Sequence, residues 1–238
     1  MNPTGKRAVV LGGTSGIGLA TARQLQEAGA SVIALSRSAD NTTTAREILG
    51  SKADVRQLDV LDREGMATTF EALAPFDIMV NAATGGARAT GPFLEMDLDG
   101  YQGSFRKLWG YTNSVRLGTQ HLAQDGCIVL VSGFPARKSP PGYAAISSVG
   151  GAVEAFCRAV AVEIAPRRIN VVSPGVIDTP MFPVQGEARE EFLAQATENK
   201  LIKRAGTGNE IAEGIMFVIR NDFVTGTTVD VDGGALLP

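Results

Sequence analysis

The hydrophobic positions form short, almost uninterrupted apolar runs, and longer stretches with apolar residues at helical spacing lie between them. The runs are rich in Val and Ile and lack polar alternation, which is typical of strands buried on both faces of a parallel sheet. The first helical stretch, 17–28, ends just before a glycine. Strands are predicted at 7–11, 31–36, 55–60, 77–82, 127–132, 168–173 and 227–232.

The alternation of strands and helices predicts an α/β, doubly wound fold with about seven parallel strands, helices on both faces and right-handed crossovers. The length of 238 residues suits a single domain that spans 1–238. The stretch from about 178 to 208 is longer than a strand-to-helix connection normally needs. We interpret this stretch as a substrate lid with a helix of its own; a plain surface excursion is the alternative.

Composition and charge narrow the class of protein. The net charge of −3, without a basic tract, argues against binding to nucleic acid or to an anionic membrane. No apolar run approaches the roughly 18 residues of a membrane span, so we expect a cytoplasmic protein. Cys127 and Cys157 lie in apolar runs and are predicted to be buried thiols. Because His121 is the single histidine, a histidine triad or multi-histidine metal site is not available, and no metal is predicted.

The first predicted strand runs into a glycine-rich turn, Leu11-Gly-Gly-Thr-Ser-Gly-Ile-Gly18, and a helix follows at once. Glycines let a backbone approach a pyrophosphate closely, and the free N–H groups and dipole of a helix amino terminus meet its charge. We predict that this turn binds a dinucleotide; a tight structural turn is the alternative. The residues assigned to the cofactor here are Gly12, Thr14, Ser15, Gly16, Ile17 and Gly18.

The end of the second predicted strand bears on which dinucleotide binds. An acidic residue there would suit a free ribose 2′-hydroxyl, but the chain has Ser36 and Arg37. An arginine flanked by hydroxyls is better matched to a 2′-phosphate, so NADP(H) is favoured over NAD(H). The alternative is that Arg37 is only a solvated charge at a strand end.

Several further motifs follow the glycine turn in a recognisable order, and with it they give the chain a resemblance to the short-chain dehydrogenase/reductase superfamily along essentially its whole length. The resemblance implies a Rossmann fold and further cofactor contacts. An acidic pair would touch adenine, an N-A-A segment matches the family's N-A-G, and a Pro-Gly turn with a following threonine would lie near the nicotinamide. These positions are Asp59, Val60, Asn81, Ala82, Ala83, Pro174, Gly175, Ile177 and Thr179.

In the family a serine polarises the carbonyl, a tyrosine exchanges a proton, and a lysine four residues further on stabilises the tyrosinate. By this resemblance Tyr143 is the catalytic tyrosine, but Ser147 stands at the lysine position. Ser132 is assigned as the serine, although it precedes Tyr143 by eleven residues, fewer than is usual in the family. Either the loop is shortened or Gly133 occupies the serine position.

The loss of the lysine is energetically serious. Bringing a tyrosine from its ordinary pKa to near neutrality takes about 4 kcal/mol, which a neighbouring ammonium provides and a serine hydroxyl does not. The family's N-x-x-G motif, which carries an asparagine of the proton relay, matches Lys107-Leu-Trp-Gly110. We therefore hypothesise that Lys107 takes the place of the missing cation. The alternatives are that Lys107 is a solvated helix lysine, or that Lys138 supplies the charge.

These features favour an NADP(H)-dependent oxidoreductase that interconverts a carbonyl and an alcohol by hydride transfer. One alternative is a regulator or scaffold that kept NADP binding and lost the chemistry, and another is a non-redox lyase or dehalogenase-like enzyme on the same fold. The substrate would be a small carbonyl or alcohol in an apolar pocket lined by Phe134, Met181, Phe182 and the loop 85–93. Small residues at 150–156 match the family's subunit-contact helix and suggest a homodimer or homotetramer.

Overall fold

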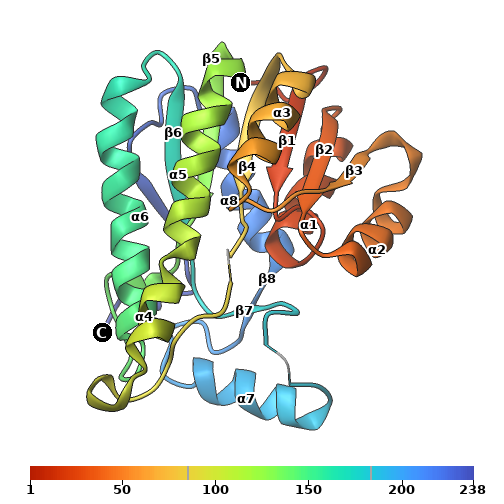
Figure 1. The fold of residues 1–238 in the computed structure, drawn as a ribbon. Helices are drawn as coiled ribbons and strands as arrows, with labels where there is room; N and C mark the ends of the chain where they lie inside the picture. Colours follow the sequence, from red (N-terminus) through yellow and green to blue (C-terminus); the bar gives the residue numbers. More distant parts are fainter. Residues whose placement is uncertain (85, 183) are drawn as a thin grey trace.

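The computed structural model describes residues 1–84, 86–182 and 184–238. It contains a parallel seven-stranded sheet in the order β3-β2-β1-β4-β5-β6-β9, which confirms the predicted fold class. Figure 1 shows the strands side by side with helices in front of and behind them. The strands are β1 Arg7–Leu11, β2 Ser31–Ser36, β3 Asp54–Gln57, β4 Phe76–Asn81, β5 Leu122–Val131, β6 Arg168–Pro174 and β9 Thr228–Val231.

The strand order reverses beside β1, because β2 and β3 lie on one side of it and β4 on the other. In open α/β sheets this switch point, at the carboxyl ends of the strands, is where ligands bind. The strand ends at this edge differ from the prediction by one residue at β4, β5, β6 and β9, and by three residues at β3. β3 ends at Gln57, so Asp59 and Val60 lie in the following loop, and β5 ends at Val131, so Ser132 begins a loop.

Alternating side chains of the strands build one hydrophobic core on each face of the sheet. Ala8 and Val10 of β1 face one core, and Val9 and Leu11 face the other. Both faces are apolar because helices cover them, which explains the uninterrupted hydrophobic runs. The first face carries α1 Gly16–Glu27, α2 Ala39–Leu49 and α8 Gly208–Arg220, and the second carries α3 Arg63–Leu73, α5 Arg106–Gly118 and α6 Ala144–Glu163.

Both cysteines belong to these cores. Cys127 and Cys157 are free and buried, and burial raises the pKa of their thiols to about 11 and about 12 respectively. The prediction of buried thiols is confirmed. A buried thiol with a raised pKa has little thiolate character at neutral pH and is therefore inert.

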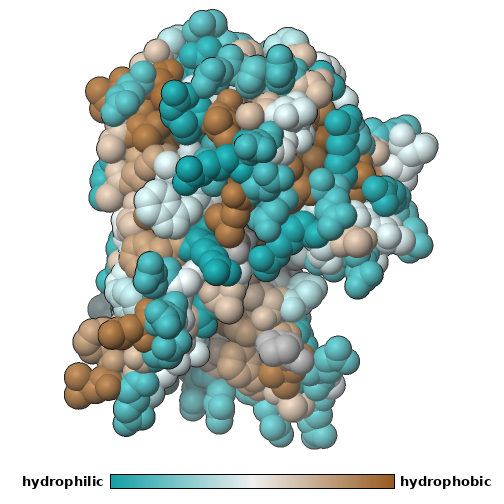
Figure 2. Space-filling model, in the orientation of Figure 1, coloured by the Kyte–Doolittle hydropathy of each residue, from teal (hydrophilic) through white to brown (hydrophobic). Residues whose placement is uncertain are grey.

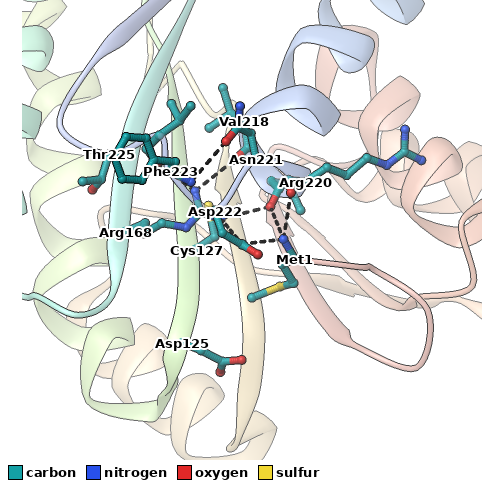
Figure 3. Close-up of polar contacts among 12 residues, drawn as sticks. Met1, Asp125, Cys127, Arg168, Val218, Arg220, Asn221, Asp222, Phe223 and Thr225 are labelled. Atoms are coloured by element: carbon teal, nitrogen blue, oxygen red, sulfur yellow. Dashed lines mark hydrogen bonds and ion pairs between the residues drawn. The ribbon is translucent and has the colours of Figure 1, made fainter.

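The amino end of the sheet is held by buried Arg168 of β6, which Figure 3 shows in close-up. Its guanidinium donates to the carbonyl oxygens of Val218 and Ile219 at the end of α8, at 3.0 and 2.9 Å, and to that of Val224 at 2.9 Å. The last carbonyls of a helix have no partner within the helix, and a cation satisfies them. Arg168 therefore fastens α8 to the sheet at the end opposite the switch point.

One described helix, α6, is long and apolar enough to cross a membrane by length and composition, with a mean hydropathy of 1.4. This corrects our statement that no stretch approaches a membrane span. A core helix of a globular protein passes the same test, and α6 packs against β6, α4 and α5. Figure 1 shows it lying along the sheet beside α5.

The two ends of the stretch 178–208 lie next to each other. β7 Ile177–Asp178 pairs with β8 Gly206–Thr207, so both ends of the excursion meet. Between them lies one helix, α7 Glu187–Thr197, as expected. In Figure 1 α7 lies beyond the carboxyl ends of the strands, opposite the amino terminus. Figure 2 shows the same view with side chains, in which α7 lies at the lower right and α4 at the lower left.

Candidate active site

The glycine turn adopts a conformation that side chains would prevent. Gly12 and Gly16 have φ angles of +74° and +50°, in the left-handed region that favours glycine. A β-carbon on Gly12 would lie 2.7 Å from the backbone nitrogen of Ala83, and one on Gly18 would overlap the carbonyl oxygen of Gly12. The turn therefore packs directly on the end of β4 and on the first turn of α1.

The amino terminus of α1 has features that fit an anionic group. Its first turn contains no acidic residue, and Ser15 stands at the N-cap without a capping side-chain hydrogen bond. The hydroxyl of Thr14 is buried and, among the described residues, has no hydrogen-bond partner. A buried hydroxyl without a partner is unfavourable, and a phosphate oxygen would satisfy it. The residues present thus fit the pyrophosphate of a dinucleotide.

Asn81 fixes the backbone that faces this turn. Its amide donates to the hydroxyl of Ser114 on α5 at 2.8 Å, and its carbonyl oxygen accepts from the N–H of Ala83 at 3.0 Å. The N–H of Ala82 donates to Leu11 at the end of β1 at 2.9 Å. Because Asn81 is fully buried, this arrangement holds the end of β4 rigidly beside the glycines.

Ser36 and Arg37 lie where a ribose-binding end of β2 is expected. The side chain of Arg37 is exposed, and its carbonyl oxygen accepts a 2.7 Å hydrogen bond from Gln57. In the loop after β3, the carboxylate of Asp59 accepts from the N–H of Leu61 at 2.9 Å. The side chain of Val60 is buried and packs on Gly110 of α5, where a β-carbon would come within 2.6 Å of it.

The Pro174-Gly175 turn lies at the same edge of the sheet. Gly175 passes so close to Asp232 that a β-carbon would overlap its carbonyl oxygen. Ile177 pairs with Gly206, and Thr179 is buried beside Gly16, 3.4 Å from where a β-carbon on that glycine would lie. Thr179, which the resemblance assigns to the nicotinamide, thus lies against the glycine turn.

Sequence reasoning missed Arg189 on α7. Its guanidinium donates to the carboxylate of Asp178 at 2.9 Å and to the carbonyl oxygens of Thr179, Phe182 and Val184 at 2.8, 2.9 and 3.0 Å. One side chain therefore fastens the segment after β7 to the helix of the excursion. Only its position in an acidic helix could have drawn attention to it in the sequence.

Tyr143 is the N-cap residue of α6, at the end of a turn that begins near Pro140. Ser147 lies one helical turn further on, and its N–H donates to the carbonyl of Tyr143 at 2.8 Å. Gly142, directly before Tyr143, has a φ of +82° and accepts a 2.9 Å hydrogen bond from the N–H of Gly91. The loop that includes residue 91 thus fixes the backbone next to the tyrosine.

Ser132 lies directly after β5, and its hydroxyl donates to the carbonyl oxygen of Gly150 on α6 at 3.2 Å. Its N–H donates to Val172 at 3.0 Å. The hydroxyl is therefore engaged with α6 in this structure, seven residues beyond Tyr143. Gly133, the alternative serine position, has no side chain.

Lys107 is the second residue of α5, which follows the short helix α4 Leu98–Ser104. Its ammonium is 3.5 Å from the carbonyl oxygen of Ser132 and 5.5 Å from the ring centre of Tyr111. Burial, and then the positive charge of Arg88, lower the pKa of Lys107 to about 8. The ammonium thus points toward the carboxyl end of β5, in a partly buried position.

Lys138, the second candidate for the missing cation, points toward the carboxyl terminus. Its ammonium donates to the carbonyl oxygen of Leu237, near the carboxyl terminus. The preceding Arg137 forms a salt bridge with Asp230 of β9 and lies 3.2 Å from the carboxylate of Glu154 on α6. These contacts hold the short loop between Ser132 and Tyr143 against β9.

Arg88 is a second residue that sequence reasoning missed. Burial lowers the pKa of its guanidinium, and the phenol of Tyr143 acts on it in the opposite direction. Arg88 also acts on Lys107, as described above. Both interactions place its charge near the predicted catalytic pair. Nothing in its sequence context distinguishes it from a solvated loop arginine.

The predicted pocket residues have different environments. Phe134 is 8% exposed, and the ammonium of Lys200 lies 5.1 Å from its ring centre. Met181 is 45% exposed, and the ring of Phe182 lies 5.0 Å from that of Phe192 on α7. The predicted loop 85–93 is described from residue 86 on; residue 85 lies outside the described part of the chain.

The chain is similar to known proteins over nearly its full length. A family model described as enoyl-(acyl carrier protein) reductase matches residues 12–235. L-xylulose reductase of Bos taurus is 31% identical over 241 residues, covering 98% of this chain and 97% of that protein. A solved small-chain dehydrogenase in complex with NADPH has a TM-score of 0.83 at 29% identity, covering 98% of this chain and 100% of that one.

A further solved structure is a short chain oxidoreductase from Pseudomonas aeruginosa PAO1, described as containing an atypical catalytic center. It has a TM-score of 0.87 at 29% identity and covers 97% of each chain.

A glycine turn at the switch point of a parallel sheet places this chain in the class of dinucleotide-binding proteins. Because the family match and the likeness to L-xylulose reductase both span nearly the whole chain, it belongs to the short-chain dehydrogenase/reductase family of oxidoreductases.

Proposed function

We propose that the protein is an NADP(H)-dependent oxidoreductase that interconverts a carbonyl compound and its alcohol. The observation that carries the proposal is the buried hydroxyl of Thr14 within the glycine turn, which has no partner among the described residues and suits a bound phosphate. Arg37 at the end of β2 supports NADP(H) over NAD(H), since a 2′-phosphate suits a guanidinium. The solved relative in complex with NADPH is consistent with this choice.

In this proposal Gly12 to Gly18, Ser36 and Arg37 hold the phosphates, and Asp59 and Val60 flank the adenine. Residues 81–83, Pro174, Gly175, Ile177 and Thr179 hold the nicotinamide half. When bound, the nicotinamide supplies the hydride that reduces the carbonyl carbon, or accepts it in the reverse direction. Tyr143 gives the carbonyl oxygen its proton, which completes the alcohol, and takes it back in the reverse direction.

The catalytic arrangement is a variant of the family's. Lys107 supplies the positive charge that Ser147 cannot, and stabilises the tyrosinate form of Tyr143. The support is its partly buried ammonium, which lies 3.5 Å from the carbonyl oxygen of Ser132, the residue that begins the loop leading to Tyr143. Ser132 polarises the carbonyl in this proposal, for which its hydroxyl must turn from Gly150 to the substrate.

The excursion 178–208 acts as the substrate lid, in one domain with the sheet. Its paired ends make a hinge at β7 and β8, and Arg189 fixes the first part of it. Homodimers or homotetramers are expected through α5 and α6, because Trp109 and Val162 are 55% and 83% exposed on these helices.

The direct test is a titration with NADPH and NADH, followed in the same cuvette by a panel of aldehydes, ketones and quinones. The proposal predicts tighter binding of NADPH and its consumption with part of the panel. Tyr143→Phe should lower turnover by about 10²–10⁴-fold without changing NADPH binding. If NADH binds more tightly, the cofactor assignment is wrong; if Tyr143→Phe keeps full turnover, the proton donor is wrong.

Two observations favour a second candidate, a regulator or scaffold that binds NADP(H) without turnover. The hydroxyl of Ser132 is engaged with Gly150, and the family's lysine is absent at Ser147. Tight NADPH binding with no consumption across the whole panel would favour this candidate.

A further inference from the structure

A cavity of about 120 Å³ is bounded by the second half of the excursion, β7, the start of α8 and the end of β9. Most of its walls are apolar, and the large aliphatic side chains among them are Val176, Ile177, Ile202, Ile211 and Val231. None of the described residues predicted for the substrate pocket lines this cavity. It is therefore a site separate from the proposed substrate pocket.

Lys200 brings a positive charge to the cavity. The residue lies in the turn after α7, where its N–H donates to the carbonyl oxygen of Thr197 at 3.0 Å. Its half-buried side chain places the ammonium 5.1 Å from the ring centre of Phe134, a cation–π contact. In the part of the chain that the structure describes, this ammonium has no hydrogen bond and no ion pair. A ring face attracts the charge without neutralising it, so Lys200 can still bind an anion.

The other charged side chains at the cavity already have partners. The carboxylate of Glu210 accepts from the guanidinium of Arg204 at 2.6 and 3.0 Å. These hydrogen bonds are the main cause that lowers the pKa of Glu210 to about 2, so the pair stays charged at neutral pH. The two carboxylate oxygens of Asp232 accept from backbone N–H groups of the following turn, at 2.9 and 3.0 Å. The N–H dipoles partly offset the negative charge of Asp232, which leaves Lys200 to meet a ligand.

We propose that the cavity binds a small aliphatic carboxylate, with the carboxylate on Lys200 and its short hydrocarbon chain against the apolar walls. An inorganic anion would leave these walls without a partner, and a neutral hydrocarbon would leave the ammonium unpaired. The ligand is bound and is not changed chemically. Because Ile177 pairs with Gly206 at the ends of the excursion, the ligand holds its second half in place, as Arg189 holds the first. The inference goes beyond the proposed function and does not depend on it.

The test is a titration of the full chain with butyrate, acetate and neutral butyramide, followed by ligand-observed NMR without added nucleotide. We expect butyrate to bind at least about 10-fold more tightly than acetate, because two further methylenes are removed from water. Butyramide has the same shape without the charge, and we expect it to bind at least about 5-fold more weakly than butyrate. Equal binding of butyrate and acetate would mean that a surface charge alone is responsible, and it would overturn the inference.

Two variants locate the site. Lys200→Met should lower the affinity for butyrate to that for butyramide, and Lys200→Arg should retain most of it. Lys203→Met is the matched control, since Lys203 is exposed, does not line the cavity, and its loss changes the net charge equally. No binding of butyrate, or an unchanged affinity in Lys200→Met, would also overturn the inference. The comparison of the three ligands on the unaltered protein decides the question even if Lys200→Met does not fold.

Discussion

The ammonium of Lys107 lies 3.5 Å from the carbonyl oxygen of Ser132, which links α5 to the carboxyl end of β5. A carbonyl oxygen supports an ammonium but does not neutralise it. Lys107 has no carboxylate partner among the described residues, so its positive charge is uncompensated by them at the edge of the sheet where the glycine turn and Tyr143 also lie. This relationship is the structural basis for proposing that the catalytic cation has moved from residue 147 to residue 107.

The first prediction concerns the dependence of activity on pH. Because the pKa of Lys107 is lowered to about 8, mainly by burial, its positive charge is present below that pH and is lost as the pH rises through it. Carbonyl reduction should therefore fall above pH about 8. In Lys107→Arg this decline should be absent, since arginine keeps its charge. A profile with the same decline in wild type and Lys107→Arg would show that another group titrates.

The second prediction concerns stability. A lysine whose pKa is lower in the folded than in the unfolded protein binds a proton less readily when folded, so its charged form opposes folding. This cost is fully present below pH about 8 and diminishes as the pH rises from there toward the ordinary value of 10.5. Lys107→Met should thus have a higher melting temperature than wild type at pH 7, with the difference shrinking at pH 9.5. A lower melting temperature at pH 7 would indicate that Lys107 stabilises the fold.

The glycine turn gives a third prediction. Gly18→Ala should abolish NADPH binding and destabilise the protein by roughly 1–3 kcal/mol, because its β-carbon would overlap the carbonyl oxygen of Gly12. Gly103→Ala in α4 is the matched control, since no atom lies within 4 Å of its β-carbon position. Fluorescence titration with NADPH and thermal melting measure both effects. Normal binding by Gly18→Ala would refute the close approach in the turn.

The fourth prediction concerns Arg189, which fastens the segment after β7 to α7. Arg189→Met removes hydrogen bonds to Thr179, Phe182 and Val184 and the ion pair with Asp178. We expect faster proteolysis within 178–208 and weaker NADPH binding through Thr179. Arg23→Met is the control, because Arg23 forms an exposed ion pair with Glu27 on α1. Unchanged proteolysis in Arg189→Met would show that other contacts hold the segment.

The sheet and the cofactor turn could be predicted from the sequence because they depend on local patterns. Buried parallel strands are apolar throughout, and Gly12, Gly16 and Gly18 mark a turn that only glycine permits. The end of β3 was predicted too far along the chain, because apolar residues recur at Leu58 and Val60, although Val60 packs on Gly110 outside the sheet.

The polar contacts across the site could not be predicted in this way. Arg88 and Arg189 come near Tyr143 and Thr179 only through the packing of α4, α6 and α7, and their sequence neighbours carry no signal. The direction of the Ser132 hydroxyl toward Gly150 likewise depends on how α6 crosses the end of β5. When a side chain contacts an element that is distant in sequence, its position and direction depend on the tertiary structure.

The relocated cation is tested most directly by exchanging the charge between its two positions. NADPH-dependent reduction of a substrate found in the panel is measured for Lys107→Asn, Ser147→Lys and the double variant. The account predicts that Lys107→Asn loses most turnover and that adding Ser147→Lys restores a large part of it, because a lysine one helical turn after Tyr143 again faces the tyrosine. Full turnover in Lys107→Asn alone would contradict the account, as would a double variant that remains as inactive as Lys107→Asn.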